Sequence, residues 1–138
     1  MRFPNNLKVF GDQSFRGDCP KETNEQITLV KCIRRQYPDT LGAVLVRVKN
    51  EGKRTQGQAH WDKAGGLTKG APDLIFPVSP ALCIELKRRD HTQSSWSTGQ
   101  KEYLEAAQKQ GAFCCVALGA DAAMEAIECY LSTATSTT

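Results

Sequence analysis

Two short apolar runs on either side of a proline-rich turn constrain the fold of this chain more than any other feature. They lie within GAPDLIFPVSPALCIELKRR, residues 70–89, where residues 74–76 and 81–84 flank the turn Pro-Val-Ser-Pro. Short apolar runs that are bounded by turn residues are typical of a buried β-hairpin. The charged side chains of this stretch gather at the end of the hairpin that lies away from the turn.

Asp73 precedes the first run, and Glu85 and Lys87 close the second. If the turn is centred on Ser79, Asp73 and Glu85 each lie six residues from the centre and therefore face each other. Facing side chains on paired strands have Cβ atoms about 5 Å apart, and like charges there are destabilising. Lys87 shares the face of Glu85, because side chains along a strand alternate with a period of two.

A divalent cation would relieve the repulsion between Asp73 and Glu85. Hard oxygen ligands suit Mg²⁺ or Mn²⁺, and such an ion activates water and stabilises the charge that develops in phosphodiester hydrolysis. Lys87 would orient the attacking water. The alternative is structural, with Asp73 as a turn residue and Glu85 paired with Lys87 at a strand end. The matched register of all three residues beside a basic stretch favours the metal site.

The rest of the chain predicts one α/β domain. Its 138 residues suit a single domain, and apolar periodicity predicts further helices and strands around the hairpin. The resulting fold class is a mixed β-sheet flanked by helices, in the order helix, three strands, helix, strand, helix. The domain covers residues 20–131, between an N-terminal arm (1–19) and a disordered tail (132–138). The predicted helices are 18–39, 97–111 and 120–131, and the remaining strands are 41–48 and 112–119.

Charge and cysteine usage narrow the function. The net charge is +3, but residues 47–70 carry six bases and two acids, which fits either a solvated loop or a phosphate-contacting surface. Six cysteines fall mostly in apolar segments without a CxxC pair, which predicts buried thiols rather than disulfides or zinc. No stretch has membrane-spanning length and no signal peptide is evident, so we expect a cytoplasmic protein.

The motifs resemble the VRR-NUC branch of the PD-(D/E)xK nucleases. Pro72-Asp73 followed by Glu85-Leu86-Lys87 has the form of the superfamily signature, and NEGKR, KGAPDLIF, CIELKRR, STGQKEYLEAAQKQGA and AAMEAIECYL are similar to the branch. The resemblance covers roughly residues 20–131 and implies a restriction-endonuclease-like fold. It also implies Mg²⁺ or Mn²⁺ bound by Asp73 and Glu85, with Lys87 as the catalytic lysine. Stand-alone members occur in phages and bacteria and are expected to be homodimers that act on branched DNA such as four-way (Holliday) junctions.

Gln100 completes the site by this resemblance, although it also suits a capping box that starts at Ser97. Its place on one helix stripe with Leu104 and Ala107 directs it toward the sheet, which favours the site. The family pattern has a serine shortly before this glutamine, and Ser94, Ser95 and Ser97 all compete for that place. Expected DNA-binding residues are the basic ones near the hairpin: Lys49, Lys53, Arg54, Lys69 and Arg88.

Two glutamates of the first helix, Glu22 and Glu25, compete to join the site. Glu22 lies in line with Gln26, Leu29 and Val30, on the apolar stripe that faces the sheet. Glu25 falls toward the edge of that stripe, where we expect solvent. The sequence therefore predicts Glu22 as a third metal-binding and catalytic residue, although any glutamate in a first turn is also favoured by the helix dipole.

The predicted function is a metal-dependent, structure-selective DNA endonuclease. A flap or nicking nuclease is an alternative, as is a non-catalytic DNA-binding or assembly module on the same fold. The intact Asp, Glu and Lys set argues against loss of catalysis. A sequence-specific restriction enzyme would need recognition elements for which so short a chain has little room.

Overall fold

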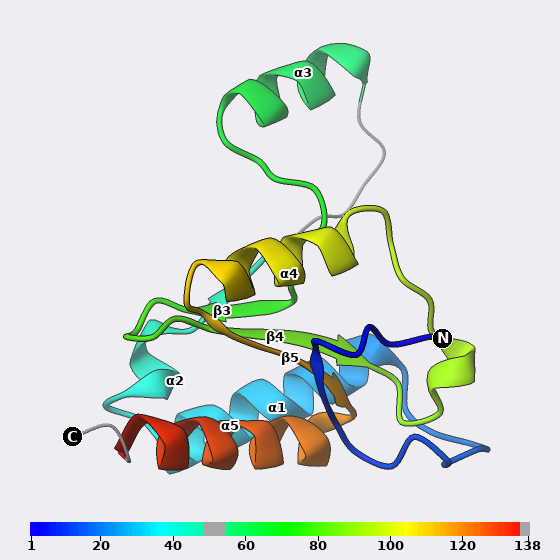
Figure 1. The fold of residues 1–138 in the computed structure, drawn as a ribbon, viewed down its shortest axis with the longest axis vertical. Coiled ribbons are helices and arrows are strands. Elements are labelled where there is room, and N and C mark those ends of the chain that lie inside the picture. The colour runs from blue at the N-terminus through cyan, green and yellow to red at the C-terminus, as the bar shows by residue number, and fades with distance from the viewer. Residues whose placement is uncertain (49–54, 136–138) are drawn as a thin grey trace.

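The computed structural model describes residues 1–48 and 55–135 of the chain. It is an α/β structure in which helices pack on both faces of a five-stranded mixed sheet (Figure 1). No helix in the described part of the chain is long and apolar enough to span a membrane. In chain order the elements are β1 (Lys8–Phe10), α1 (Glu22–Gln36), α2 (Leu41–Val44), β2 (Val46–Arg47), α3 (Gln56–Ala64), β3 (Leu74–Phe76), β4 (Leu82–Lys87), the short 3₁₀ helix η1 (His91–Gln93), α4 (Gln100–Lys109), β5 (Phe113–Leu118) and α5 (Ala120–Thr135).

The sheet has the strand order β1-β5-β4-β3-β2. β4 runs parallel to β5, and β5 runs parallel to β1, whereas β3 pairs antiparallel with both β2 and β4. In the hairpin, Leu74 pairs with Ile84 and Phe76 with Leu82. This is the register centred on Ser79 that the sequence predicted, so the expectation is confirmed.

Successive side chains of β4 point to opposite faces of the sheet, and each face has its own hydrophobic core. Leu82, Ile84 and Leu86 belong to the larger core, which α1 and α5 cover with residues such as Leu29 and Ile127. Cys83 of the opposite face packs in a smaller core with Leu104 of α4, together with Cys114, Val116 and Leu118 of β5. Glu85 and Lys87 therefore continue the face that α4 covers (Figure 1).

The prediction that residues 1–19 form an arm outside the domain is wrong. Residues 8–10 form β1, which pairs with β5 at the edge of the sheet, and Leu7 is buried in the smaller core. The short strand shows no period of its own, because its place depends on pairing with a strand about a hundred residues later. The predicted disordered tail (132–138) is also wrong for residues 132–135, and residues 136–138 lie outside the described residues. α5 continues to Thr135, and the Thr133 hydroxyl donates to the carbonyl of Cys129 within that last turn.

The predicted strand 41–48 is mostly wrong, because residues 41–44 form the short helix α2. Gly42 donates its backbone N–H to the carbonyl of Tyr37 at the end of α1, over 2.7 Å. A Cβ atom on Gly42 would lie 2.6 Å from that same oxygen, so this close turn requires glycine. Only Val46 and Arg47 remain to pair with β3.

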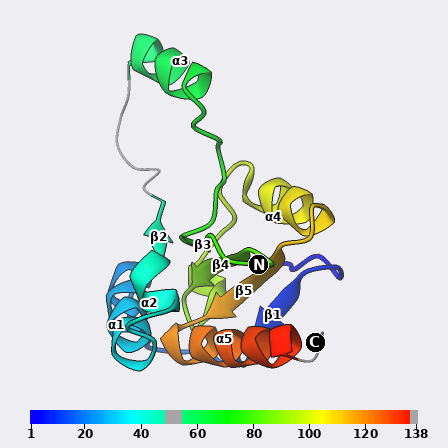
Figure 2. The ribbon, with the colours of Figure 1, turned by 90° about the vertical axis from the view of Figure 1, so that its left-hand side faces the viewer.

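The basic stretch, residues 47–70, contains the helix α3, which the sequence did not predict because its apolar residues show no clear period. α3 begins with a capping box in which Thr55 Oγ1 accepts from the Gln58 N–H while Gln58 Oε1 accepts from the Thr55 N–H, both over 3.1 Å. No residue of α3 is buried. Both ribbon views show it standing away from the sheet (Figures 1 and 2).

All six cysteines are free, and Cys83, Cys114 and Cys115 are buried, as predicted. Burial raises the pKa of the Cys115 thiol above its usual range. A thiol with a raised pKa stays protonated and is a poor nucleophile or metal ligand. Cys115 therefore behaves as a small core residue.

Candidate active site

The site begins with two carboxylates at the open end of the β3–β4 hairpin. Asp73 comes just before β3, and its Oδ2 accepts a hydrogen bond from the backbone N–H of Leu86, over 2.7 Å. Glu85 lies within β4 and is only 1% exposed. The register that pairs Leu74 with Ile84 brings Asp73 and Glu85 together across the two strands, as the sequence predicted.

Glu85 is a buried acid with one oxygen satisfied and one not. Its Oε1 accepts from Gln100 Nε2 over 3.0 Å and lies 3.6 Å from Lys87 Nζ. Its Oε2 is buried and has no hydrogen-bond partner among the described residues. Burial raises the pKa of Glu85 well above its usual range, and the charge of Asp73 raises it further, against the opposing effect of Lys87. The pocket therefore disfavours a second negative charge unless a cation accompanies it.

Lys87 is almost fully buried, at 2% exposure. Its Nζ donates to the carbonyl of Ser95 over 2.8 Å and to Gln100 Oε1 over 3.0 Å. The same nitrogen lies 5.5 Å from the centre of the Trp96 ring, within range of a cation–π interaction. These contacts fix the ammonium group beside Glu85. Ser95 and Trp96, in the loop between β4 and α4, supply two of them.

Gln100 makes hydrogen bonds that fit both of the interpretations considered from the sequence. Its Oε1 accepts from the N–H of Ser97 over 2.7 Å, as the returning half of a capping box would. The amide also bridges the two charged groups of β4, donating to Glu85 and accepting from Lys87. α4 nevertheless starts at Gln100 rather than Ser97, because Gly99 adopts a left-handed conformation with φ of 88° and ends the preceding loop.

Two glycines bring the start of α4 against the hairpin, and this contact was not predicted. A Cβ atom on Gly70 would lie 2.2 Å from the carbonyl carbon of Gly99, so only glycine allows the two backbones to approach so closely. Gly70 also has a φ of +85°, which favours glycine in any case. The contact joins the segment that leads to Asp73 with the residue that precedes Gln100. The signal in the sequence was a glycine within each of the motifs KGAPD and STGQ.

The structure places Glu22 beside these residues and gives Glu25 a different environment. Ser94 Oγ donates to Glu22 Oε1 over 2.7 Å and accepts from the Arg88 N–H over 3.0 Å. The charge of Glu22 also contributes to the raised pKa of Glu85. Of the three competing serines, Ser94 is thus the one that contacts a site carboxylate through its hydroxyl.

The expectation that Glu25 faces solvent is wrong. Glu25 is 8% exposed, and its Oε2 accepts a hydrogen bond from the Ala120 N–H at the start of α5. A carboxylate at this position satisfies an unpaired backbone N–H and interacts favourably with the helix dipole. Glu25 is therefore the N-terminal cap of another helix. Its burial was not evident from α1 alone, because its partner lies 95 residues away.

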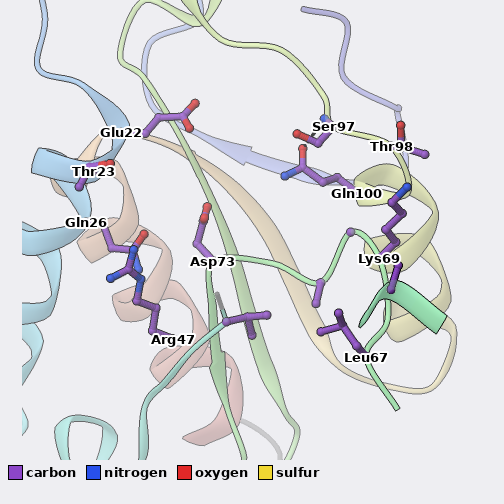
Figure 3. A pocket seen from close by; sticks show the side chains of 14 residues that line it. Glu22, Thr23, Gln26, Arg47, Leu67, Lys69, Asp73, Ser97, Thr98 and Gln100 are labelled. Carbon is purple, nitrogen blue, oxygen red and sulfur yellow. Dashed lines mark hydrogen bonds between the residues drawn. The ribbon is translucent and has the colours of Figure 1, made fainter. Parts of the chain in front are cut away.

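A groove of about 650 Å³ runs along this side of the molecule and contains part of the site. Figure 3 shows Glu22, Asp73 and Gln100 around the groove, with Arg47 and Lys69 also on its walls. Lys69 is exposed there, and a DNA contact by Lys69 stays a prediction. The predicted DNA-binding residues Lys49, Lys53 and Arg54 lie outside the described residues.

Arg88 has structural partners rather than a free side chain. Its guanidinium donates to the carbonyls of Cys19 over 2.6 Å and Pro20 over 3.2 Å. These bonds hold the segment before α1, and so the position of Glu22, against the end of β4. A DNA contact by Arg88 stays a prediction.

The residues present fit a divalent cation bound with water and substrate. The unpartnered Oε2 of Glu85, next to Asp73, is an oxygen that burial leaves without a hydrogen bond. Within the described residues, no group of three or more His, Cys, Asp or Glu side chains is arranged to hold a metal ion by itself. Mg²⁺ needs no such group, because it usually keeps several waters and binds through one or two carboxylates plus substrate phosphates.

The mixed sheet, its flanking helices and the hairpin-end carboxylates define a restriction-endonuclease-like α/β domain. No family model matches the chain, and no curated protein matches it. A solved structure described as a VRR_NUC domain protein is similar, with a TM-score of 0.68 and 25% sequence identity over 86% of this chain and 92% of that chain. This similarity confirms the relationship to the VRR-NUC family that the sequence motifs indicated, and it supports a nuclease-type domain.

Proposed function

We propose that the protein is a metal-dependent DNA endonuclease that hydrolyses phosphodiester bonds. The observation that carries the proposal is the buried, unpartnered Oε2 of Glu85 beside Asp73. A protein that only bound DNA would gain nothing from a buried acid whose charge is disfavoured. A metal-dependent nuclease would use such an acid to hold a cation, and the cation would relieve the repulsion between the two carboxylates.

Asp73 and Glu85 would hold Mg²⁺ or Mn²⁺, with Glu22 as the third carboxylate of the site. When bound, the ion lowers the pKa of a coordinated water and offsets negative charge on the phosphate that is attacked. Ser94 holds the Glu22 carboxylate in place, and the Leu86 N–H holds that of Asp73. The chain thus orients each carboxylate through a separate hydrogen bond.

Lys87 and Gln100 act as a pair in this proposal. The ammonium group of Lys87 is held by two carbonyl-type oxygens and lies 3.6 Å from Glu85 Oε1, so its charge stays beside the proposed metal site. Its positive charge favours the anionic transition state, and burial strengthens that interaction. Gln100 keeps Lys87 and Glu85 at a fixed separation by binding both.

We further propose that the substrate is branched DNA, such as a four-way junction, and that the active form is a homodimer. The support is the resemblance to stand-alone VRR-NUC proteins, together with the small size of the domain. Two cuts across one junction require two active centres, and a single copy of this chain offers one. The basic segment 47–69, which includes Lys69 on the groove wall, is the proposed phosphate-contacting surface.

Cleavage of labelled DNA tests the proposal directly. Linear duplex, 5′ and 3′ flap, splayed-arm and four-way junction substrates of shared sequence are incubated with the protein in Mg²⁺, Mn²⁺ or EDTA. We expect metal-dependent cutting, with the four-way junction preferred, and a dimer by light scattering. Preference for a flap or a single-strand nick would replace the junction assignment. Binding without cutting in either metal would contradict the endonuclease.

A further inference from the structure

Gln26 of α1 is a polar side chain in the groove to which neither the sequence motifs nor the proposed chemistry assigns a role. Its Nε2 is buried and has no hydrogen-bond partner among the described residues. A buried amide N–H that donates to nothing costs free energy, so such groups are uncommon in folded proteins. Gln26 also lines the same groove as Glu22 and Asp73 (Figure 3).

The surroundings of Gln26 differ in charge from those of the proposed metal ligands. Glu22 and Asp73 give one part of the groove a negative charge, while Arg47 of β2 lines the same groove and brings a positive charge to it (Figure 3). Thr23, in the same turn of α1, adds a hydroxyl to this groove. An arginine, an unpaired amide donor and a hydroxyl together suit an anion with several acceptor oxygens.

Gln26 lies four residues after Glu22, so the two side chains share a face of α1 one turn apart. One helical turn is about 5.4 Å. Neighbouring phosphates of one strand are farther apart than the axial rise of about 3.4 Å in duplex DNA, because the backbone winds around the axis, so this separation corresponds to about one nucleotide step. A strand whose scissile phosphate meets the metal near Glu22 and Asp73 would therefore place a neighbouring phosphate near Gln26.

We infer that Gln26 and Arg47 form a second phosphate subsite, which binds one of the two DNA phosphates next to the scissile one. This inference rests on the proposed nuclease function and adds a determinant of where the strand lies. The acidic part of the groove admits a phosphate only with a cation, whereas the Gln26 part binds one without it. The subsite thus holds the strand in register before the metal site is filled.

A methylphosphonate scan tests the subsite. The DNA that the wild-type protein cuts best is synthesised with a single neutral methylphosphonate at each of several positions around the cut. Binding is measured by fluorescence anisotropy in EDTA, so that cleavage does not interfere. For the wild-type protein we expect one of the two positions next to the cut to weaken binding about tenfold, the effect of losing a hydrogen bond to a charged group.

The variants Gln26→Met and Gln26→Glu then identify the side chain. Gln26→Met keeps the length but removes the amide donor and leaves Arg47 in place, so the sensitive methylphosphonate should weaken its binding less than it weakens wild-type binding, while other positions keep their wild-type effects. Gln26→Glu should bind unmodified DNA more weakly than Gln26→Met, because it places a negative charge beside the phosphate. Asn24→Met, at an exposed position of the same helix outside the groove, is the matched control and should scan like the wild type.

The outcomes separate this inference from the proposed function. A flat wild-type scan overturns the subsite even if every Gln26 variant misfolds, and so does an equal sensitive position in Gln26→Met and the wild type. If the wild-type protein cuts DNA and the subsite fails either test, the nuclease stands and only the subsite is wrong. If the wild-type protein neither binds nor cuts any DNA, both are wrong.

Discussion

The hairpin-end site and the projecting helix α3 are both polar, but they are stabilised in opposite ways. At the site, Glu85 and Lys87 are 1% and 2% exposed, and each is held by side chains or carbonyls from other elements. α3 has no buried residue, its Trp61 is 76% exposed, and its N-terminus is satisfied by its own capping box (Figure 2). Changes at the site should therefore affect both stability and chemistry, whereas changes in α3 should leave both largely intact.

The difference also shows where the chain accepts an unfavourable arrangement. Two facing carboxylates and a buried lysine cost free energy, and a well-packed apolar cluster of similar size would be more stable. Proteins retain such arrangements mainly at functional sites, where the cost is repaid by binding or catalysis. α3 has no buried residue and so no buried charge, and its stability therefore gives no indication of its role.

The largest expected effect comes from neutralising either hairpin carboxylate. Asp73→Asn or Glu85→Gln should lower the cleavage rate about a thousandfold, the effect of losing about 4 kcal/mol of metal-dependent transition-state stabilisation. Neither variant should lower the melting temperature measured without metal, because each removes a like-charge repulsion. Undiminished cleavage by either variant, or by the wild type in EDTA, would show that the site does not hold the metal.

The pH dependence of Glu85→Gln sharpens this prediction. The folded state raises the pKa of Glu85 above its unfolded value, so ionisation of this group opposes folding. The penalty is absent below the unfolded pKa and grows as pH rises toward the folded pKa. The stability gained by Glu85→Gln without metal should therefore be full at high pH and vanish on acidification, as followed by urea denaturation.

The next largest effect should separate the two glutamates of α1. Glu22→Gln should reduce cleavage roughly 10- to 100-fold with little change in DNA binding, as expected for a carboxylate in or next to the metal shell. Glu25→Gln should leave cleavage near the wild-type rate at low temperature but cost about 1 kcal/mol of stability, because it weakens the cap of α5. The pair is compared by single-turnover cleavage and thermal denaturation, and the opposite pattern would reverse the two assignments.

A smaller effect should come from Asp90, which fixes the loop on which Lys87 depends. Its carboxylate accepts from the N–H groups of Gly17 and Thr92, the Thr92 hydroxyl and the Gln93 amide, and these bonds lower its pKa well below the usual range. A lowered folded pKa contributes stability above the unfolded pKa of about 3.9 that is lost as pH falls further. Asp90→Asn should thus melt at a lower temperature than the wild type at pH 7, and the difference should shrink below pH 4. A difference that is constant with pH would mean that the charge of Asp90 contributes nothing.

Much of the site could be predicted because its elements are close in sequence. The two apolar runs and their proline turn set the hairpin register, and a period of two then put Glu85 and Lys87 on one face. Glu25 could not be predicted, because its cap on Ala120 depends on how α1 meets a helix 95 residues later. β1 escaped notice for the same reason, since three residues without a clear period become a strand only beside β5.

The smallest expected effect concerns α3, the exposed region in the comparison with the hairpin-end site. Trp61 is a large apolar side chain on a helix without buried residues, and its ring meets that of its neighbour His60 edge-on, with the ring centres 6.3 Å apart. Trp61→Ala should change the free energy of unfolding by less than about 0.5 kcal/mol, as exposed substitutions usually do. Trp96→Ala is the contrasting variant and should be clearly destabilising, because Trp96 Nε1 donates to the Arg2 carbonyl and its ring packs on Phe3. Both are measured by urea denaturation at two protein concentrations. A loss above 1 kcal/mol for Trp61→Ala that grows with protein concentration would mean that a second copy of the chain buries α3, and the contrast between the two regions would then hold only for the monomer.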